Sequence, residues 1–141
     1  MTLAERLRPL ADLVPILESP DADFGRWETP APVDDVLRMP YYVFGPTADA
    51  FRAAVASGGW IVMGFDWDAW LQEADGSALR DRPETVATAS PDQLGWFLTA
   101  IVRSDRFVEG SIAGAFESGL LAGIARRAAA LLEELEPRPG V

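Results

Sequence analysis

The sequence predicts an all-α fold, a single compact multi-helix domain over residues 1–141, with room for one short two-stranded β element. Three observations support this prediction. Apolar residues recur at the three- and four-residue spacing of a buried helix face in several segments. Two capping boxes, which are typical of helix starts, occupy residues 2–5 and 90–93. One apolar segment, residues 60–65, lacks helix start signals and is expected to be extended.

The N-terminal segment predicts a helix that begins at Leu3, because Thr2 and Glu5 form the first of these capping boxes. Pro9 is expected to strain or interrupt this helix, and Pro15 is expected to end it. Its inner face would be formed by Leu3, Leu7, Leu10 and Val14.

Residues 19–40 predict a loop-rich segment, since they contain four prolines, Gly25 and several aspartates. Apolar residues within the segment argue against a linker, so it is expected to wrap around the core, with one helical turn over residues 33–38. These apolar residues are Phe24, Trp27, Val33, Val36 and Leu37.

A helix is predicted after the break at Gly45 and Pro46, where Thr47 can act as the N-cap and Gly58 as the stop. The extended segment 60–65 follows, and its evident strand partner is residues 41–44.

Asp66 is a good N-cap for the next helix, predicted over residues 67–74 and stopped by Gly76. Its apolar stripe is Trp67, Trp70, Leu71 and Ala74. A short helical segment is expected over residues 83–89.

Residues 90–136 predict a three-helix C-terminal core. Ser90, Pro91 and Gln93 start its first helix, Gly119 is placed as a C′ glycine before the third, and Pro137 would end the third. The apolar faces would be formed by Leu94, Phe97, Leu98, Ile101 and Val102, then by Val108, Ile112, Ala115 and Phe116, then by Leu120, Leu121, Ile124, Ala128, Leu131, Leu132 and Leu135.

The composition excludes several kinds of chemistry. The chain has no Cys and therefore no thiolate nucleophile or zinc–thiolate site, and it has no His, the side chain that most often acts as a general base. All twelve cations are Arg, so a Schiff-base lysine is also absent. We therefore predict no catalytic residue, no metal and no cofactor, which favours a non-enzymatic protein.

The net charge of −10 argues against nucleic acid and anionic membranes as ligands, and it favours a basic protein as a partner. The N-terminal segment lacks the apolar region of a signal peptide, and the longest uncharged run, residues 53–65, is too short to span a bilayer. The chain is therefore expected in the cytoplasm.

A charged cluster between the first two C-terminal helices is the best candidate site. It consists of Arg103, Asp105, Arg106 and Glu109. Ser104 or Asp105 can cap the second helix, Arg106 and Glu109 can pair at a three-residue spacing, and Arg103 can complement the end of the first helix. This polar corner is therefore interpreted mainly as a structural joint, in which the charges neutralise one another.

The alternative interpretation is a binding or hydrolytic site around the same four residues, with a carboxylate of raised pKa in an aromatic pocket. Its lining would come from Trp67, Trp70, Tyr41 and Tyr42. This alternative requires the charged groups to converge on a solvent-reachable cavity.

Two acidic patterns are candidates for a metal site. Asp66 and Asp68 with Glu73 could present carboxylates to Mg²⁺, but acids in the first turn of a helix are routine. Asp21 and Asp23 lack the spacing of a calcium loop. Neither pattern predicts a metal.

The segment 98–110 resembles the signature of a small bacterial family carried as a domain of unknown function. The resemblance rests on Leu98-Thr99-Ala100, Arg103, Asp105-Arg106-Phe107 and Glu109-Gly110, together with Tyr41-Tyr42, Phe51, Phe65-Asp66-Trp67, Trp70, Glu117, Gly119 and Arg127. It covers roughly residues 40–132. Ser111 stands where the family commonly has His. The resemblance implies a shared fold and polar corner, and no activity.

These observations together predict an acidic, non-enzymatic protein that binds a basic protein, such as an immunity, antitoxin or phage-conflict factor. The alternative is a small carboxylate-dependent hydrolase or small-molecule-binding domain at the charged cluster. The apolar stripes of the first and last helices also leave room for a homodimer.

Overall fold

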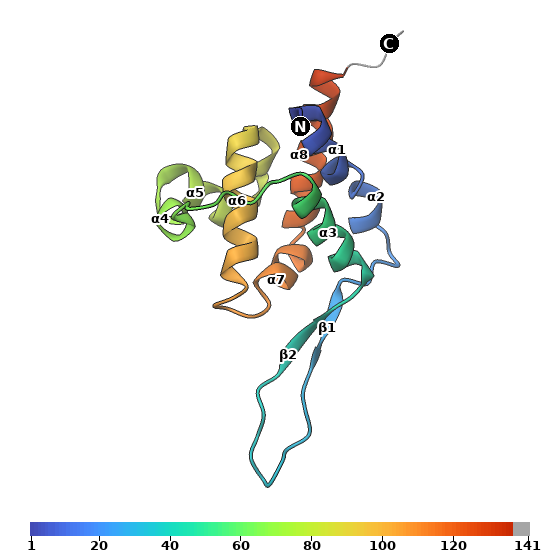
Figure 1. Cartoon of the computed structure of the whole chain (residues 1–141), viewed down its shortest axis with the longest axis vertical. Coiled ribbons are helices and arrows are strands. Elements are labelled where there is room, and N and C mark those ends of the chain that lie inside the picture. Colours follow the sequence, from blue (N-terminus) through green and yellow to red (C-terminus); the bar gives the residue numbers. More distant parts are fainter. Residues whose placement is uncertain (137–141) are drawn as a thin grey trace.

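The two ends of the described chain pack against each other as a pair of helices. A computed structural model describes residues 1–136, and in it α1 (Leu3–Ala11) lies along α8 (Leu120–Leu135) (Figure 1). Leu7 and Leu10 are fully buried in this contact, and Arg8 forms an ion pair of 2.6 Å with Glu136. The predicted capping box of Thr2 and Glu5 is confirmed, with both reciprocal hydrogen bonds present.

The two N-terminal prolines are accommodated differently from the prediction. Pro9 lies inside α1, which continues to Ala11. Pro15 does not end the first helix, which stops at Ala11; it lies in the first turn of α2 (Val14–Leu17), where the missing N–H is not needed.

The short β element is present, but its strands are not the predicted ones. β1 (Gly25–Glu28) pairs antiparallel with β2 (Tyr41–Phe44), in a register that places Gly25 opposite Phe44 and Glu28 opposite Tyr41. Residues 60–65 therefore form no strand with residues 41–44. The segment crosses α6 as irregular backbone instead, because the side chain of Thr99 accepts a hydrogen bond from the amide of Val62 at 2.9 Å.

Residues 29–40 extend away from the helical body and do not wrap around its core (Figure 1). Every residue from 31 to 40 is exposed. Asp34 and Asp35 have φ values of 51° and 60°, and Val33 and Val36 form a bridge around them. Two left-handed residues make a tight hairpin turn, so the predicted helical turn over residues 33–38 is wrong. We call residues 25–44 the arm and residues 33–39 its tip.

After the arm, α3 (Pro46–Ser57) begins and ends close to the predicted positions. Gly58 closes it as expected, but Gly45 is the N-cap and Thr47 is not. Thr47 is buried, and its hydroxyl accepts a hydrogen bond from the amide of Asp23 at 3.0 Å, which ties the start of this helix to the segment before the arm.

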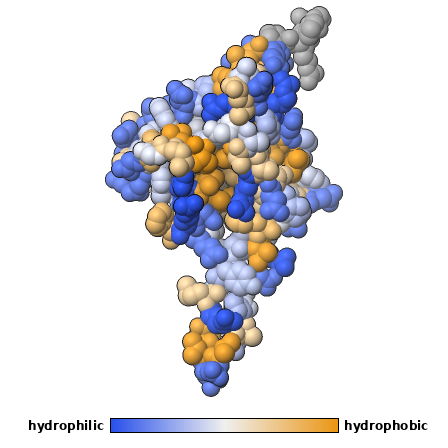
Figure 2. All heavy atoms as spheres, viewed as in Figure 1, coloured by the Kyte–Doolittle hydropathy of each residue, from blue (hydrophilic) through white to orange (hydrophobic). Residues whose placement is uncertain are grey.

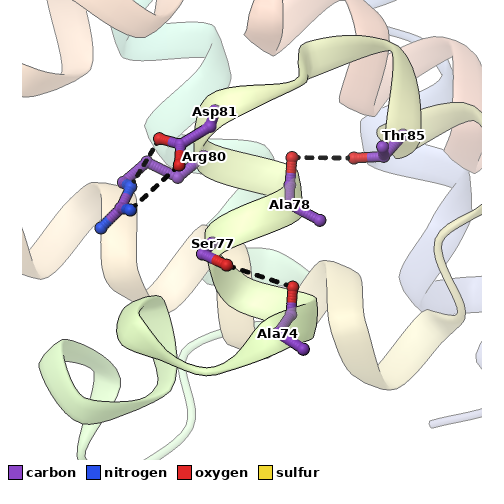
Figure 3. Close-up of polar contacts among 6 residues, drawn as sticks. All are labelled: Ala74, Ser77, Ala78, Arg80, Asp81 and Thr85. Carbon is purple, nitrogen blue, oxygen red and sulfur yellow. Dashed lines mark hydrogen bonds and ion pairs between the residues drawn. The ribbon is translucent and has the colours of Figure 1, made fainter.

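The predicted helix over residues 67–74 is split in two. Asp66 caps α4 (Trp67–Gln72) as expected, but the chain turns at Glu73 and continues as α5 (Ala74–Asp81). Gly76 lies inside α5 because it packs against α4, where an added Cβ would be 2.1 Å from the carbonyl oxygen of Trp70. Hydroxyl groups of Ser77 and Thr85 donate to carbonyl oxygens of α5, and Thr85 thereby ties α5 to the 3₁₀ helix η1 (Pro83–Thr88) (Figure 3).

The C-terminal core consists of α6 (Pro91–Ser104), α7 (Ser111–Glu117) and α8. The capping box of Ser90 and Gln93 is confirmed. Gly119 has φ 83° and donates its amide to Phe116, as expected of a glycine that ends one helix and allows the next. The predicted end at Pro137 lies outside the described residues. Within residues 1–136, no helix is long and apolar enough to cross a bilayer.

Candidate functional site

The polar corner lies in the connection between α6 and α7, which is a series of turns over residues 105–110. Gly110, with φ 94°, is the N-cap of α7, so the helix starts only at Ser111. Val108 was expected on the inner face of this helix but is 65% exposed. Arg106 and Glu109 therefore lie on a loop, where a helical three-residue spacing no longer brings them together. We call residues 105–110 the corner loop.

Each carboxylate of the corner contacts backbone rather than an arginine. Oδ1 of Asp105 accepts a hydrogen bond from the amide of Ile112 at 3.1 Å, so it satisfies one free amide in the first turn of α7. The N-cap residue is Gly110, however, and not Ser104 or Asp105 as predicted. Oε1 of Glu109 accepts from the amide of Tyr42 at 2.9 Å, so the predicted pair with Arg106 is wrong. Asp105 and Glu109 therefore each join the corner to another segment of backbone.

Within residues 1–136, the two arginines of the corner form no ion pair with a carboxylate. Nη2 of Arg103 lies 3.4 Å from the sulfur of Met63, which is a weak acceptor. Arg106 is exposed, and none of the ion pairs formed within residues 1–136 involves it or Arg103. The expectation that the corner neutralises itself is therefore wrong, because the loop geometry directs its acids to backbone amides.

The corner loop holds the base of the arm. The amide of Tyr42 in β2 is bound by Glu109, and Trp27 in β1 covers Gly110 so closely that an added Cβ would lie 2.6 Å from its ring. The rings of Trp27 and Tyr42 meet edge to face at 5.4 Å. Burial raises the pKa of the Tyr42 phenol, and the nearby carboxylates of Glu117 and Asp23 add to this shift.

Phe24 anchors the arm one residue before β1. It is buried, and its ring stacks on Phe116 of α7 with centroids 4.4 Å apart. Phe44, which lies opposite Gly25 at the same end of the strand pair, meets Phe24 edge to face at 6.4 Å. Both strands of the arm are therefore seated on α7 and the corner loop, which sets the direction in which the arm leaves the body.

The four aromatic residues predicted as one lining are found in three places. Trp70 is buried among Phe65, Trp96 and Phe97. Tyr41 and Tyr42 belong to the arm. Trp67 alone borders a hollow, and it does so with residues that the sequence did not single out for that role.

This hollow has a volume of about 450 Å³ and lies beside the corner loop. The residues lining it are Trp67, Asp68, Ser104, Phe107 and Val108. The rings of Trp67 and Phe107 lie 6.2 Å apart. Because none of the four charged corner residues lines this hollow, the corner and the hollow do not form the carboxylate pocket that a hydrolase would need.

A second hollow, of about 330 Å³, lies between α5, α6 and α7. Its lining is mostly apolar, with Arg80 as its one cation. Figure 3 shows that both carboxylate oxygens of Asp81 meet the guanidinium group of Arg80, at 2.8 and 3.1 Å. This pairing raises the pKa of Arg80, whose positive charge is paired with the carboxylate of Asp81.

Among the acidic residues considered as candidate metal ligands, Asp66 has a structural contact. Oδ1 of Asp66 accepts from the amide of Ala69, which is the helix-capping interpretation. In the part of the chain that the structure describes, no three His, Cys, Asp or Glu side chains converge in a way that could hold a metal ion.

Residues 2–134 of the chain match a known family, described as a family of unknown function (DUF6508). No curated protein and no solved structure matches the chain. The family match spans the arm, the corner loop and both hollows, and its description assigns no activity to any of them.

Proposed function

Because the chain belongs to a family of unknown function, its function has to be inferred from its surface, and we propose that it is a non-enzymatic, acidic binding protein that docks onto a partner protein through its arm. The observation that carries this proposal is the exposed apolar tip. Leu37 is 86% exposed and Met39 is 84% exposed, and Val33 and Val36 are exposed beside them.

The arm has the properties of a binding element rather than of a loose connection. Figure 2 shows apolar side chains grouped near the end of the arm, beyond a largely polar stretch next to the body. An exposed apolar group of this kind typically marks a contact with another molecule. The seated base limits the entropy that is lost on binding, because Phe24 and Trp27 already hold the strands in place.

The charges of the tip indicate the chemistry of the partner. Asp34 and Asp35 stand at the turn, between apolar residues, and within residues 1–136 no ion pair involves them. A matching partner surface is therefore apolar and rimmed by arginine or lysine, which narrows the expectation of a basic protein to a basic, apolar patch. A bacterial immunity, antitoxin or phage-conflict factor acting in the cytoplasm has a role of this kind.

The hydrolase alternative receives no support from the contacts of the corner. Asp105 and Glu109 are each bonded to a backbone amide, on opposite sides of the loop. Neither lines the hollow beside Trp67 and Phe107.

The test is a chain with a shortened arm. Residues 30–39 are replaced by Asn-Gly, the dipeptide preferred in two-residue hairpin turns, which preserves the pairing of β1 and β2. Wild-type and shortened chains are compared in quantitative capture of host proteins, and each captured protein is then purified and titrated by calorimetry. The shortened chain is expected to bind the partner at least about tenfold more weakly, with an unchanged unfolding midpoint.

The matched control is Ile16→Ser, which removes an apolar side chain that is 41% exposed on α2, away from the arm. It is expected to bind as the wild type does. A folded, shortened chain that binds every partner as tightly as the wild type would contradict the proposal.

A further inference from the structure

The hollow of about 450 Å³ beside the corner loop combines aromatic rings with a carboxylate, and we call it the aromatic hollow. It is lined by Trp67 and Asp68 at the start of α4, by Ser104 at the end of α6, and by Phe107 and Val108 of the corner loop. Among these five residues of the described chain, Asp68 alone is charged. These groups define the chemistry of a ligand that fits the hollow.

The two aromatic rings form the apolar part of the lining. Trp67 and Phe107 lie 6.2 Å apart, and Phe107 is 78% exposed, so its ring contributes little to the core of the body. An exposed apolar group of this size typically marks a contact with another molecule. The face of an aromatic ring is electrostatically negative and attracts a cation that lies over it. The rings therefore favour a ligand that is both apolar and positively charged.

The polar groups of the lining offer acceptors. Asp68 is exposed, and none of the ion pairs formed within residues 1–136 involves it. The hydroxyl group of Ser104 donates its proton to the carbonyl oxygen of Ile101 at 3.0 Å, so its oxygen is left to accept. A neutral apolar ligand would remove water from the carboxylate without replacing it, whereas a cation compensates the charge. Both polar groups therefore point to a cationic ligand.

Backbone hydrogen bonds hold the two sides of the aromatic hollow in place. The amide of Trp67 donates to the carbonyl oxygen of Phe65 at 3.0 Å. The amides of Phe107 and Val108 both donate to the carbonyl oxygen of Ser104, at 3.0 and 2.9 Å. A site whose walls are already fixed loses little conformational entropy when a ligand binds.

The arginines of the corner do not occupy the aromatic hollow. Arg103 contacts the sulfur of Met63, and Arg106, next to Phe107 in the chain, is exposed; neither lines the hollow. The charge of Asp68 is therefore not neutralised from this side. The net charge of −10 on the whole chain also raises the local concentration of cations around it.

We propose that the aromatic hollow binds an alkylated ammonium group, such as the trimethylammonium group of choline or of a methylated lysine. Its methyl groups contact Trp67 and Phe107, and its charge is balanced by Asp68. A small, strongly hydrated cation would lose water to aromatic walls that cannot replace it, whereas an alkylated ammonium carries its charge beneath apolar methyl groups. This binding site is separate from the arm and goes beyond the proposed function of the arm.

The experiment follows the indole N–H signal of Trp67 by NMR while the full chain is titrated with tetramethylammonium chloride or choline chloride. The variant Trp67→Phe assigns this signal. Sodium chloride at the same ionic strength is the blank, and dimethylbutanol, the uncharged analogue in which carbon replaces the nitrogen of choline, is the neutral probe. Both ammonium probes are expected to shift the signal to saturation, and the neutral probe should bind at least about tenfold more weakly.

Two variants test the charge and the ring separately. Asp68→Asn keeps the size of the side chain and removes its charge, so choline should bind at least about tenfold more weakly. Asp92→Asn is the matched control, because Asp92 is also an exposed acid in the first turn of a helix but lies at the opposite end of α6 from Ser104. Phe107→Leu keeps an apolar side chain without the ring and should weaken binding about threefold.

A peptide containing trimethyllysine distinguishes the two sources of the ammonium group. Tighter binding of this peptide than of choline, and of the unmodified peptide only weakly, assigns the site to a methylated protein. Binding of choline at least as tight as that of the peptide assigns it to a free small molecule.

Three outcomes overturn the proposal. A Trp67 signal that no ammonium probe shifts to saturation shows that the hollow holds no such ligand. Equal binding of choline and its neutral analogue shows that only an apolar shape is recognised. Equal weakening in Asp68→Asn and Asp92→Asn shows a general attraction of cations to an acidic chain. The chain with the shortened arm is expected to bind choline as the wild type does, so failure of this site and failure of the arm are told apart.

Discussion

The helical body and the arm handle their apolar residues in opposite ways. In the body, Trp60, Phe51 and Leu98 are almost completely buried, and the indole of Trp60 also donates to the carbonyl oxygen of Arg6 at 3.0 Å. In the arm, ten consecutive residues, 31–40, are exposed although they include Val33, Leu37 and Met39.

This difference separates the residues that stabilise the fold from those that contribute little to it. A buried side chain contributes to folding because it leaves water and fills space, and an exposed one contributes little to folding. The arm therefore gains its shape from the strand pair and from its contacts with α7 and the corner loop, while its tip is exposed and contributes little to folding. Substitutions should destabilise the fold most in the body, less where the arm contacts α7 and the corner loop, and least at the tip.

The largest effect is expected where the arm enters the body. Phe24→Ala removes a ring that is 3% exposed and stacked on Phe116, and it should lower the free energy of unfolding by about 4 kcal/mol. Urea unfolding measures this change. Leu37→Ala, at the exposed tip, is the control and should stay within about 0.5 kcal/mol of the wild type. Equal losses for the two variants would contradict the division between body and arm.

A smaller effect is expected at Gly110, where the corner loop supports the arm. Gly110→Ala places a side chain at φ 94° and against Trp27, so it should lower the free energy of unfolding by about 2 kcal/mol. Gly119→Ala is the matched control, since Gly119 has φ 83° but open space around it, and it should cost only about 1 kcal/mol. The difference between these two unfolding free energies measures how tightly Trp27 seats the arm. No difference would mean that Trp27 is not held there.

The smallest effect is expected at Glu109. If Arg106 were buried and paired with Glu109, Glu109→Ala would leave it unpaired and would lower the free energy of unfolding by about 3 kcal/mol. Arg106 is exposed, and the carboxylate instead binds one amide, that of Tyr42, so the expected loss is about 0.5 kcal/mol. Hydrogen exchange of the Tyr42 amide should accelerate in Glu109→Ala and stay unchanged in Arg106→Ala. Acceleration in both variants would show that the corner works as one charged network after all.

Much of the helical fold could be predicted because its signals are local. The capping boxes of Thr2 and Ser90 and the cap at Asp66 depend on residues three positions apart, and all three are formed. Gly119 likewise ends α7 as its sequence context indicates. Such features need only a few neighbouring residues to satisfy the first free amides of a helix.

The errors concern contacts between distant segments. The strand partner of Tyr41–Phe44 is Gly25–Glu28 and not residues 60–65, where the amide of Val62 instead donates to the hydroxyl group of Thr99. The corner was expected to pair its own charges, but Glu109 found an amide 67 residues away. The sequence of the tip did contain a signal for its hairpin turn, because two aspartates between valines are compatible with a turn of two left-handed residues.

The sequence by itself determined which segments become helices, where most of them begin, and which reaction types the chain lacks the side chains to perform. Hydrogen bonds and burial within a few residues are enough to specify these properties. Only the tertiary structure decided that the apolar residues of the arm stay in water and that the corner acids join backbone segments. Each of these depends on which surfaces meet across the chain, and residue spacing alone carries no such information.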